Sequence, residues 1–155
     1  MSQAQVHIEN FTNEGYIKSA NKGIQAARGK TVVLVCNDTK LIQGKLSELT
    51  GDGYRFPVIE GKDRPFWDGA FYAFPKAIGG LYDEHFHTYF GDLDKFYSAK
   101  QQGIPLTQVP SVMVHHAQSA TTNYKGIRQS QYEADHLTFI EKWGFDPLDN
   151  YLDLI

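Results

Sequence analysis

The chain has a single cysteine, Cys36, so it cannot form an internal disulfide bond. One cysteine also leaves no thiolate cluster that could bind a structural zinc ion. The absence of disulfides fits a reducing compartment. The first residues show neither the basic region nor the apolar region of a secretory signal. We therefore expect a cytoplasmic protein.

Long apolar runs and an excess of positive charge are missing as well. The longest aliphatic run covers residues 32–35, far fewer than the roughly 20 residues that a membrane-spanning helix needs. The 15 Lys and Arg residues are outnumbered by 18 Asp and Glu residues, which gives a net charge of -3. We therefore expect no membrane span and no nucleic-acid partner.

Several common chemical motifs are absent. The sequence contains no GxxxxGK[ST] or GxGxxG phosphate loop and no HExxH zinc motif. It also lacks the GxSxG element of serine hydrolases, and its one cysteine lies inside an apolar run. These absences argue against enzymes that bind nucleotides through a glycine-rich phosphate loop, against zinc proteases and against hydrolases with a serine or cysteine nucleophile.

The patterns that are present predict one α/β domain over residues 1–155. Hydrophobic residues make up 41% of the chain and charged residues 21%, which is a globular balance. Residues 5–10 alternate as a strand does, residues 16–27 have helical spacing, and residues 31–36 form a β-branched run expected to be buried on both faces. A strand, a helix and a buried strand in this order predict a βαβ unit and a parallel sheet.

The remaining elements are predicted from local spacing and turn residues. We expect a short helix within 42–49, an edge strand at 54–59, a strand at 69–74, a helix from 92 to about 102, a strand at 106–115 and a helix at 129–143. We find no internal repeat.

The first candidate for chemistry is the sequence Asn37-Asp38-Thr39, which follows the most apolar predicted strand. Ligands of open α/β sheets collect outside the carboxyl ends of the strands. Asp38 is therefore well placed to bind a divalent cation and its phosphate ligand. The alternative is an ordinary turn in which Asp38 caps the backbone.

The second candidate is the pair Asp92 and Asp94 at the start of a predicted helix. Side chains two residues apart on a helix point in directions about 200° apart, so one carboxylate can face a cleft as a general base while the other is paired elsewhere. The alternative is an acidic first turn that complements the helix dipole.

The third candidate is the pair His115 and His116 at the end of an apolar strand. Successive strand residues point to opposite faces, so at most one imidazole can enter a given site and bind a metal. The alternative is that both are surface or hydrogen-bonded residues.

Taken in order, these segments resemble the family-2 glycosyltransferases of the GT-A fold. The likeness runs from about residue 6 to residue 144. It rests on NEGYIKSANKGIQAARG (13–29), VVLVCNDT (32–39), AIGGLYDEHF (77–86), YFGDLD (89–94), the strand at 110–119 and KWG (142–144). The family's first two strands, one of which holds the nucleotide base and ribose, have no counterpart in these residues.

The resemblance implies a reduced GT-A fold, which is a three-layer sandwich around a mainly parallel mixed sheet. It also implies a metal-dependent, inverting transfer of a sugar from a nucleotide sugar, with a UDP-sugar expected, to an acceptor hydroxyl. The implied cofactor is Mn²⁺ or Mg²⁺.

The resemblance also assigns residues to roles. Asp92 would be the catalytic base, and Asp38 and His115 would bind the metal. The donor would be bound by Asn13, Lys18, Asn21 and Asn37, and the acceptor or sugar side would be formed by Gly79, Gly80, Asp83 and Glu84. Two positions depart from the family pattern: Cys36 replaces the first acid of the metal motif, and Gly91 replaces the Glu before the base.

Two other functions stay open. One is a non-catalytic remnant of the fold that binds a sugar, a nucleotide or a protein partner. The other is a metal-dependent phosphohydrolase that uses Asp38 and His115. Because the missing strands would leave a sheet edge uncovered, we also expect a homo-oligomer.

Overall fold

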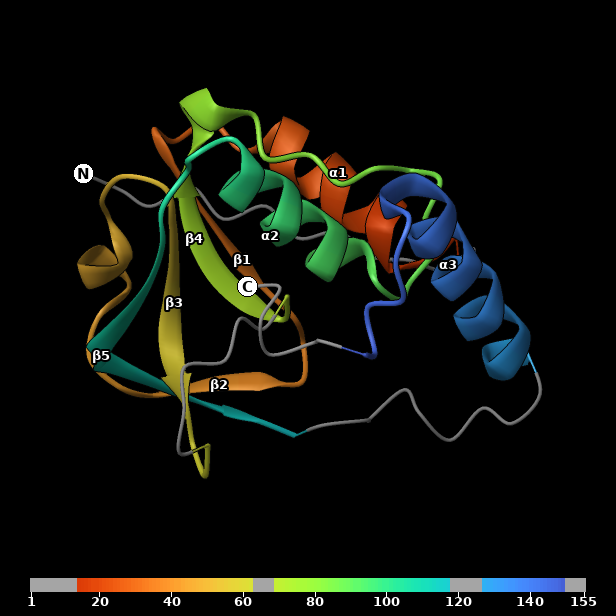
Figure 1. Ribbon diagram of the computed structural model, residues 1–155. Helices are drawn as coiled ribbons and strands as arrows, with labels where there is room; N and C mark the ends of the chain where they lie inside the picture. Colours follow the sequence, from red (N-terminus) through yellow and green to blue (C-terminus); the bar gives the residue numbers. More distant parts are fainter. Residues whose placement is uncertain (1–13, 63–68, 118–126, 150–155) are drawn as a thin grey trace.

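A computed structural model describes residues 14–62, 69–117 and 127–149 (Figure 1). The three helices are α1 (Tyr16–Ala26), α2 (Gly91–Gln101) and α3 (Ile127–Trp143). The strands are β1 (Thr31–Val35), β2 (Thr39–Gln43), β3 (Tyr54–Ile59), β4 (Phe71–Pro75) and β5 (Leu106–His116), with 3₁₀ turns η1 (Leu46–Leu49) and η2 (Lys76–Ile78).

The five strands form one mixed sheet in the order β1-β4-β3-β5-β2. Within the described residues only the β3–β5 pair is parallel, and the other three pairs are antiparallel. The expectation of a mainly parallel sheet is therefore wrong for this part of the chain. Two parallel strands must be joined by a crossover connection. Along the chain, α2 is the one α-helix between described strands, and it belongs to the connection from β3 to β5. The strand predicted at residues 5–10 lies outside the described residues.

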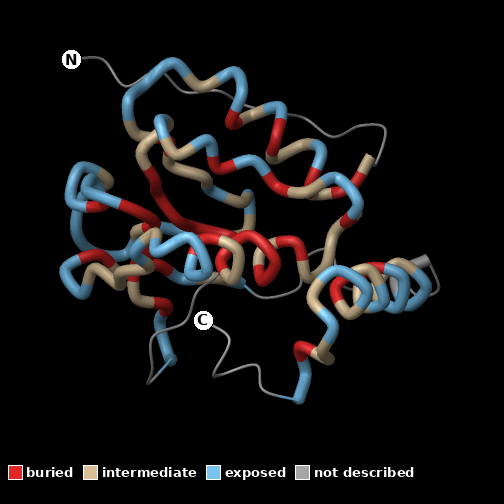
Figure 2. Tube along the Cα trace, turned by 45° about the horizontal axis from the view of Figure 1, so that its top comes forward, coloured by how far each residue is buried: buried red, intermediate tan, exposed pale blue. Residues whose placement is uncertain are grey.

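Helices α1 and α2 pack on one face of the sheet, and α3 lies beside these helices (Figures 1 and 2). Ile17 of α1, Phe96 of α2 and Phe139 of α3 belong to a single buried cluster with alternate residues of β1, β3 and β4. The opposite face has a smaller cluster, to which η1 contributes Leu49. The described elements therefore form two layers instead of the three expected, because the second face is covered by a 3₁₀ turn and not by an α-helix.

The positions of two strands in the sheet also differ from expectation. The apolar run expected to be buried on both faces forms the edge strand β1, and Val35 at its end is 50% exposed. The predicted edge strand is instead the central strand β3, whose Pro57 adjoins a register shift against β5. A bulge accommodates a proline in a central strand because the ladder hydrogen bonds are already interrupted there.

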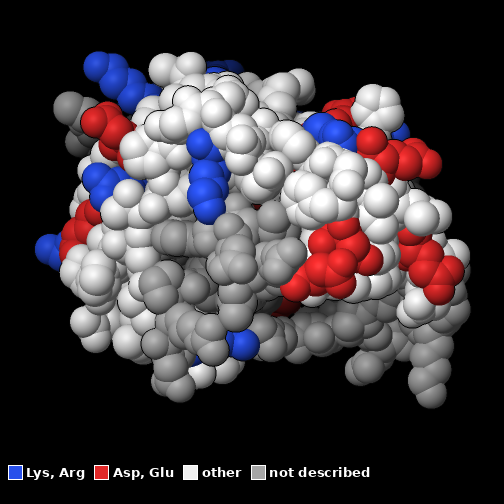
Figure 3. Space-filling model, in the orientation of Figure 1, with Lys and Arg blue, Asp and Glu red and all other residues white. Residues whose placement is uncertain are grey.

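Among the described residues, no helix combines the length and the apolar character that crossing a lipid bilayer requires. On the face drawn in Figure 3, acidic side chains gather on the right, and Lys and Arg are spread mainly along the left and the top. The visible charges therefore do not form a continuous basic surface.

Candidate functional site

The predicted metal motif forms a tight turn between two edge strands. The backbone N–H of Cys36 donates to the Ala70 carbonyl at 2.8 Å, which ties the end of β1 to the start of β4. Both the N–H and the hydroxyl of Thr39 donate to the Cys36 carbonyl, at 3.2 and 2.7 Å. These bonds close residues 36–39 into a turn and bring the chain back as β2.

The turn brings Asp38 next to His116. The carbonyl of Asp38 accepts from the N–H of Ala117 at 2.9 Å, and its Oδ2 lies 3.4 Å from His116 Nε2. Both side chains are mostly buried, with exposed fractions of 17% and 14%. His115 faces the other way, and its Nδ1 lies 2.8 Å from Glu60 Oε2 in an exposed pair. The structure thus brings Asp38 together with His116 and not with His115, the histidine predicted from the resemblance.

A carboxylate oxygen and an imidazole nitrogen that converge in this way fit a divalent cation such as Mn²⁺. In the described part of the chain, no group of three or more His, Cys, Asp or Glu side chains is placed to hold a metal ion. A cation between Asp38 and His116 would therefore take its other ligands from a diphosphate and water, which is common for cations in phosphate sites.

Asp92 lies at the same end of the sheet. A Cβ atom added to Gly69 would lie 2.8 Å from Asp92 Cβ, so the Asp92 side chain packs directly against the backbone at Gly69. That backbone leads into β4, whose Phe71 is paired with Val35 at the end of β1. Asp92 is partly buried, and its Oδ1 accepts from the N–H of Leu93 at 2.9 Å.

Two features of the backbone before Asp92 fix its position. Phe90 has a φ of 56° and is the one non-glycine residue with a positive φ among those described. Such a conformation costs on the order of 1–3 kcal/mol and persists only where the surroundings enforce it. A Cβ on Gly91 would lie 2.4 Å from Ile17 Cδ1, so glycine is needed for the close approach of α2 to α1.

The loop before α2 is held by a buried carboxylate of α3. Asp135 is 2% exposed and accepts hydrogen bonds from the backbone N–H groups of His87, Thr88 and Tyr89, at 2.7 to 2.8 Å. A charged acceptor with three donors is a strong, directional anchor. Asp135 therefore couples α3 to the segment that carries Asp92.

Asp94 has a different environment from Asp92. Its Oδ1 accepts from Trp143 Nε1 at 2.8 Å, and its two oxygens lie 2.9 and 3.1 Å from Lys142 Nζ. The side chain is only 4% exposed. The predicted divergence of the two carboxylates is thus confirmed: Asp94 links α2 to α3, and Asp92 faces the end of the sheet.

Among the predicted donor-binding residues, Asn21 is already bonded within the fold. Asn21 is buried and holds the backbone of Tyr82 through two hydrogen bonds, from Asn21 Nδ2 to the carbonyl at 3.0 Å and from the N–H to Asn21 Oδ1 at 2.8 Å. Asn21 is therefore a structural link between α1 and the following loop. Lys18 and Asn37 are exposed, and Asn13 lies outside the described residues.

The predicted acceptor loop passes between α1 and α2. Gly79 and Gly80 both have a positive φ, of 81° and 67°, and a Cβ on Gly80 would lie 2.3 Å from the Phe74 ring. Glu84 accepts from Asn21 Nδ2 at 3.1 Å, and Asp83 forms an ion pair of 2.7 Å with Lys142. Gly79 and Glu84 are exposed, whereas Gly80 is buried.

A buried chain of hydroxyl groups runs from this loop to Gly69. Lys95 Nζ donates to the Tyr72 hydroxyl at 2.8 Å, which donates to the Tyr82 hydroxyl at 2.8 Å. Tyr16 donates to the Gly69 carbonyl at 2.7 Å and lies 3.1 Å from the Tyr82 hydroxyl. Each hydroxyl has one hydrogen, so Tyr82 donates to Tyr16 and all the bonds run in one direction, from Lys95 to Gly69.

Burial determines the protonation of this chain. It raises the pKa of Tyr16, Tyr72 and Tyr82 well above the ordinary value, because a phenolate would lose its solvation. The same loss of solvation lowers the pKa of Lys95 well below the ordinary lysine value. The three phenols therefore stay protonated and serve as hydrogen-bond donors.

Sequence patterns did not predict a role for Lys95, Asp135 or His116. Lys95 lies four residues before buried Ala99 on α2, so its position on the buried face could have drawn attention to it. Asp135 gives no comparable signal, because a lone acid in a polar helix usually faces solvent.

Comparisons with known protein families, with curated proteins and with solved structures found no match to this chain.

Proposed function

We propose that this chain is a metal-dependent, inverting glycosyltransferase that uses a nucleotide sugar, with a UDP-sugar as the expected donor. The observation that carries the proposal is the arrangement at one end of the sheet. There Asp38, in the turn after β1, meets His116 at the end of β5, and Asp92 packs against Gly69 just before β4.

In this proposal Asp92 removes the proton of the acceptor hydroxyl as its oxygen attacks the anomeric carbon. The bond from that carbon to the diphosphate breaks on the opposite face, so the configuration inverts. Asp38 and His116 would hold the divalent cation, which supplies positive charge to the leaving diphosphate. Lys18 is exposed on α1 and can add a second positive charge.

Two contacts support the role of Asp92 as a positioned base. The left-handed Phe90 and the Asp135 anchor fix the backbone immediately before it. A general base needs a backbone that is held in this way, because small displacements of a catalytic group lower the reaction rate by large factors.

A second candidate function is binding without transfer. Asn21, expected to approach the diphosphate, uses its amide to hold Tyr82 and Glu84. A domain with fewer donor contacts could still bind a sugar, a nucleotide or a protein. Turnover of a nucleotide sugar would exclude this alternative.

The proposal is tested by calorimetric titration of UDP, GDP and dTDP with and without Mn²⁺. We expect saturable, Mn²⁺-dependent binding of UDP that weakens at least about tenfold in Asp38→Ala and His116→Ala, because each removes one metal ligand. His115→Ala is the matched control and should bind as the wild type does. Loss of binding in His115→Ala with retention in His116→Ala would contradict the assignment.

Self-association remains a prediction. β1 and β2 are the outer strands of the described sheet, and Val35, Leu41 and Ile42 on them are 50%, 36% and 47% exposed. Light scattering at micromolar concentration should detect a species larger than 17.5 kDa.

A further inference from the structure

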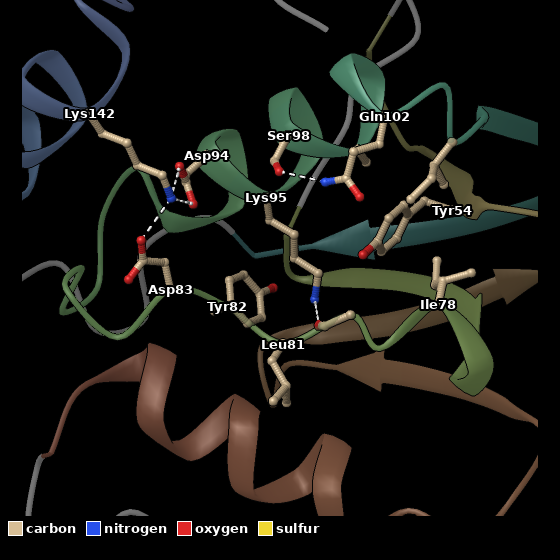
Figure 4. A pocket seen from close by; sticks show the side chains of 13 residues that line it. Tyr54, Ile78, Leu81, Tyr82, Asp83, Asp94, Lys95, Ser98, Gln102 and Lys142 are labelled. Atoms are coloured by element: carbon tan, nitrogen blue, oxygen red, sulfur yellow. Dashed lines mark hydrogen bonds and ion pairs between the residues drawn. The ribbon is translucent and has the colours of Figure 1, made fainter.

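A second candidate site lies beside α2, and Asp92 is not among the residues that line it. It is a cavity of about 290 Å³ between α2 and the loop that follows η2 (Figure 4). This volume is at the lower limit of about 300 Å³ for ligand pockets, so the cavity suits only a small ligand. Two buried charged residues line it, Asp94 and Lys95, with 3% and 5% of the residue exposed.

Lys95 has no acidic partner within the described residues. Its Nζ donates to the Tyr72 hydroxyl at 2.8 Å and to the Gly80 carbonyl. The nearby carboxylates of Asp83 and Asp94 are bound to Lys142 instead, at 2.7 and 2.9 Å. The two acceptors match the two N–H bonds of a neutral amine.

Four aromatic rings also lie near the amine. The ring centroid of Tyr82 lies 4.0 Å from Nζ, and those of Phe74, Tyr72 and Tyr54 lie at 4.9, 5.1 and 5.6 Å. Ring faces attract an ammonium ion and offset part of the loss of solvation. Burial still lowers the pKa of Lys95, so the neutral form, which carries a nucleophilic lone pair, is favoured relative to an exposed lysine.

We propose that Lys95 captures a short-chain hydroxyaldehyde in this cavity as an imine. The lone pair of Nζ forms a bond to the carbonyl carbon, and one amine proton moves to the carbonyl oxygen. The carbon–oxygen bond then breaks as the carbon–nitrogen double bond forms, and the oxygen leaves as water with the second amine proton. One amine and one aldehyde give one imine and one water, without any oxidant or reductant.

The polar side chains of the cavity select the hydroxyaldehyde class. Ser98 and Gln102 line the same wall of α2 and are hydrogen-bonded to each other at 3.0 Å. A hydroxyl and an amide can bind the hydroxyl groups of a two- or three-carbon sugar fragment. Leu81 and Ile104 supply the apolar part of the lining. This inference is independent of the proposed transferase activity.

The test is reductive trapping of glycolaldehyde with cyanoborohydride on the folded protein near neutral pH, followed by peptide mass mapping. Lys100 is the matched control, because it is an exposed lysine on the same helix. We expect Lys95 to be labelled at least about tenfold faster than Lys100, since the protonated amines of exposed lysines do not react. Labelling of Lys95 at the same rate as Lys100, or more slowly, would overturn the proposal.

Two further measurements separate the cavity from the local sequence. In urea-unfolded protein the two lysines should be labelled at equal rates, whereas a preference for Lys95 that persists there would contradict a role for the cavity. Propanal has no hydroxyl group for Ser98 and Gln102 to bind, so it should label Lys95 less efficiently than glycolaldehyde does. Equal labelling by the two aldehydes would overturn the proposed hydroxyaldehyde class.

Discussion

Asp92 and Asp94 lie two residues apart on α2 but belong to different regions of the molecule. Asp94 is 4% exposed, and both of its oxygens contact Lys142 or Trp143 of α3. Asp92 faces the opposite direction, against Gly69 at the end of the sheet where Asp38 and His116 meet. One carboxylate therefore joins helices, while the other is oriented toward the candidate site.

The two lysines of the cavity differ in the same way. Burial works against the charge of Lys142, but its hydrogen bonds to Asp83 and Asp94 outweigh this and raise its pKa. Lys95 is buried without a carboxylate partner, so burial lowers its pKa. The comparison teaches that a carboxylate partner, and not burial alone, decides the direction in which the pKa of each lysine moves.

The largest effect on stability should come from Asp94→Ala. Removing this buried carboxylate leaves the Trp143 N–H without its acceptor and Lys142 paired with Asp83 alone, which costs about 2 kcal/mol in the free energy of unfolding. Asp92→Ala should cost about 1 kcal/mol or less, chiefly through the helix dipole. Urea denaturation measures both. Equal losses in the two variants would contradict the division of roles.

A smaller, pH-dependent effect should separate the two lysines. Below the ordinary lysine pKa, Lys95 is protonated in the unfolded chain, whereas burial disfavours its protonation in the folded protein. The unfolded state therefore binds more protons, so the stability of the wild type rises with pH relative to that of Lys95→Met. We expect this difference to grow as the pH rises from neutral toward about 10, the ordinary lysine pKa. The groups that face Lys95 are Tyr54, Tyr72 and Tyr82, with Asp94 and Lys142 on the same cavity.

Lys142→Met is the matched control for that measurement. The folded-state pKa of Lys142 is raised, so its contribution is present throughout this interval and is lost only at higher pH. The tyrosines add little change here, because their pKa values lie at or above 10 in both states, and burial raises that of Tyr54 to about 12. A Lys95→Met difference that is constant with pH would show that Lys95 is charged in the folded protein.

The smallest effect should come from Asp83→Asn. Burial opposes the carboxylate of Asp83, but hydrogen bonds from Lys142 and His85 outweigh it and hold its pKa well below the usual range. A depressed pKa stabilises the fold above the unfolded value of about 4, and this contribution is lost as the pH falls. Because the pair is partly exposed, we expect less than about 0.5 kcal/mol at neutral pH and almost none in acid. Acid titration of the unfolding midpoint checks this.

Local patterns predicted most of the elements but not their arrangement. The helix expected at 16–27 is α1, and the helix expected from 92 to about 102 is α2. β2 was missed, because its residues Leu41 and Ile42 are followed by Gly44 and could equally begin a short helix. Strand order depends on long-range pairing, so β1 and β3 exchanged their expected edge and central positions.

The candidate site was predictable where it depends on local geometry. The alternation of strand side chains correctly indicated that only one histidine of the pair could meet a given group, but not that it is His116. Asn21 could not be recognised as a structural residue, because its partner Tyr82 lies 61 positions away in the chain. The same is true of Lys95, whose aromatic surroundings come from β3, β4 and the loop after η2.

The most direct test of the proposed transferase is the turnover of UDP-sugars with Mn²⁺ by the wild type and by Asp92→Asn. We expect the wild type to consume a UDP-sugar and Asp92→Asn to be slower by about 10³-fold, because a general base contributes factors of this size. Asp52→Asn, at an exposed position away from the site, should be unaffected. Turnover by Asp92→Asn at the wild-type rate, with the fold intact by thermal melting, would contradict the central claim.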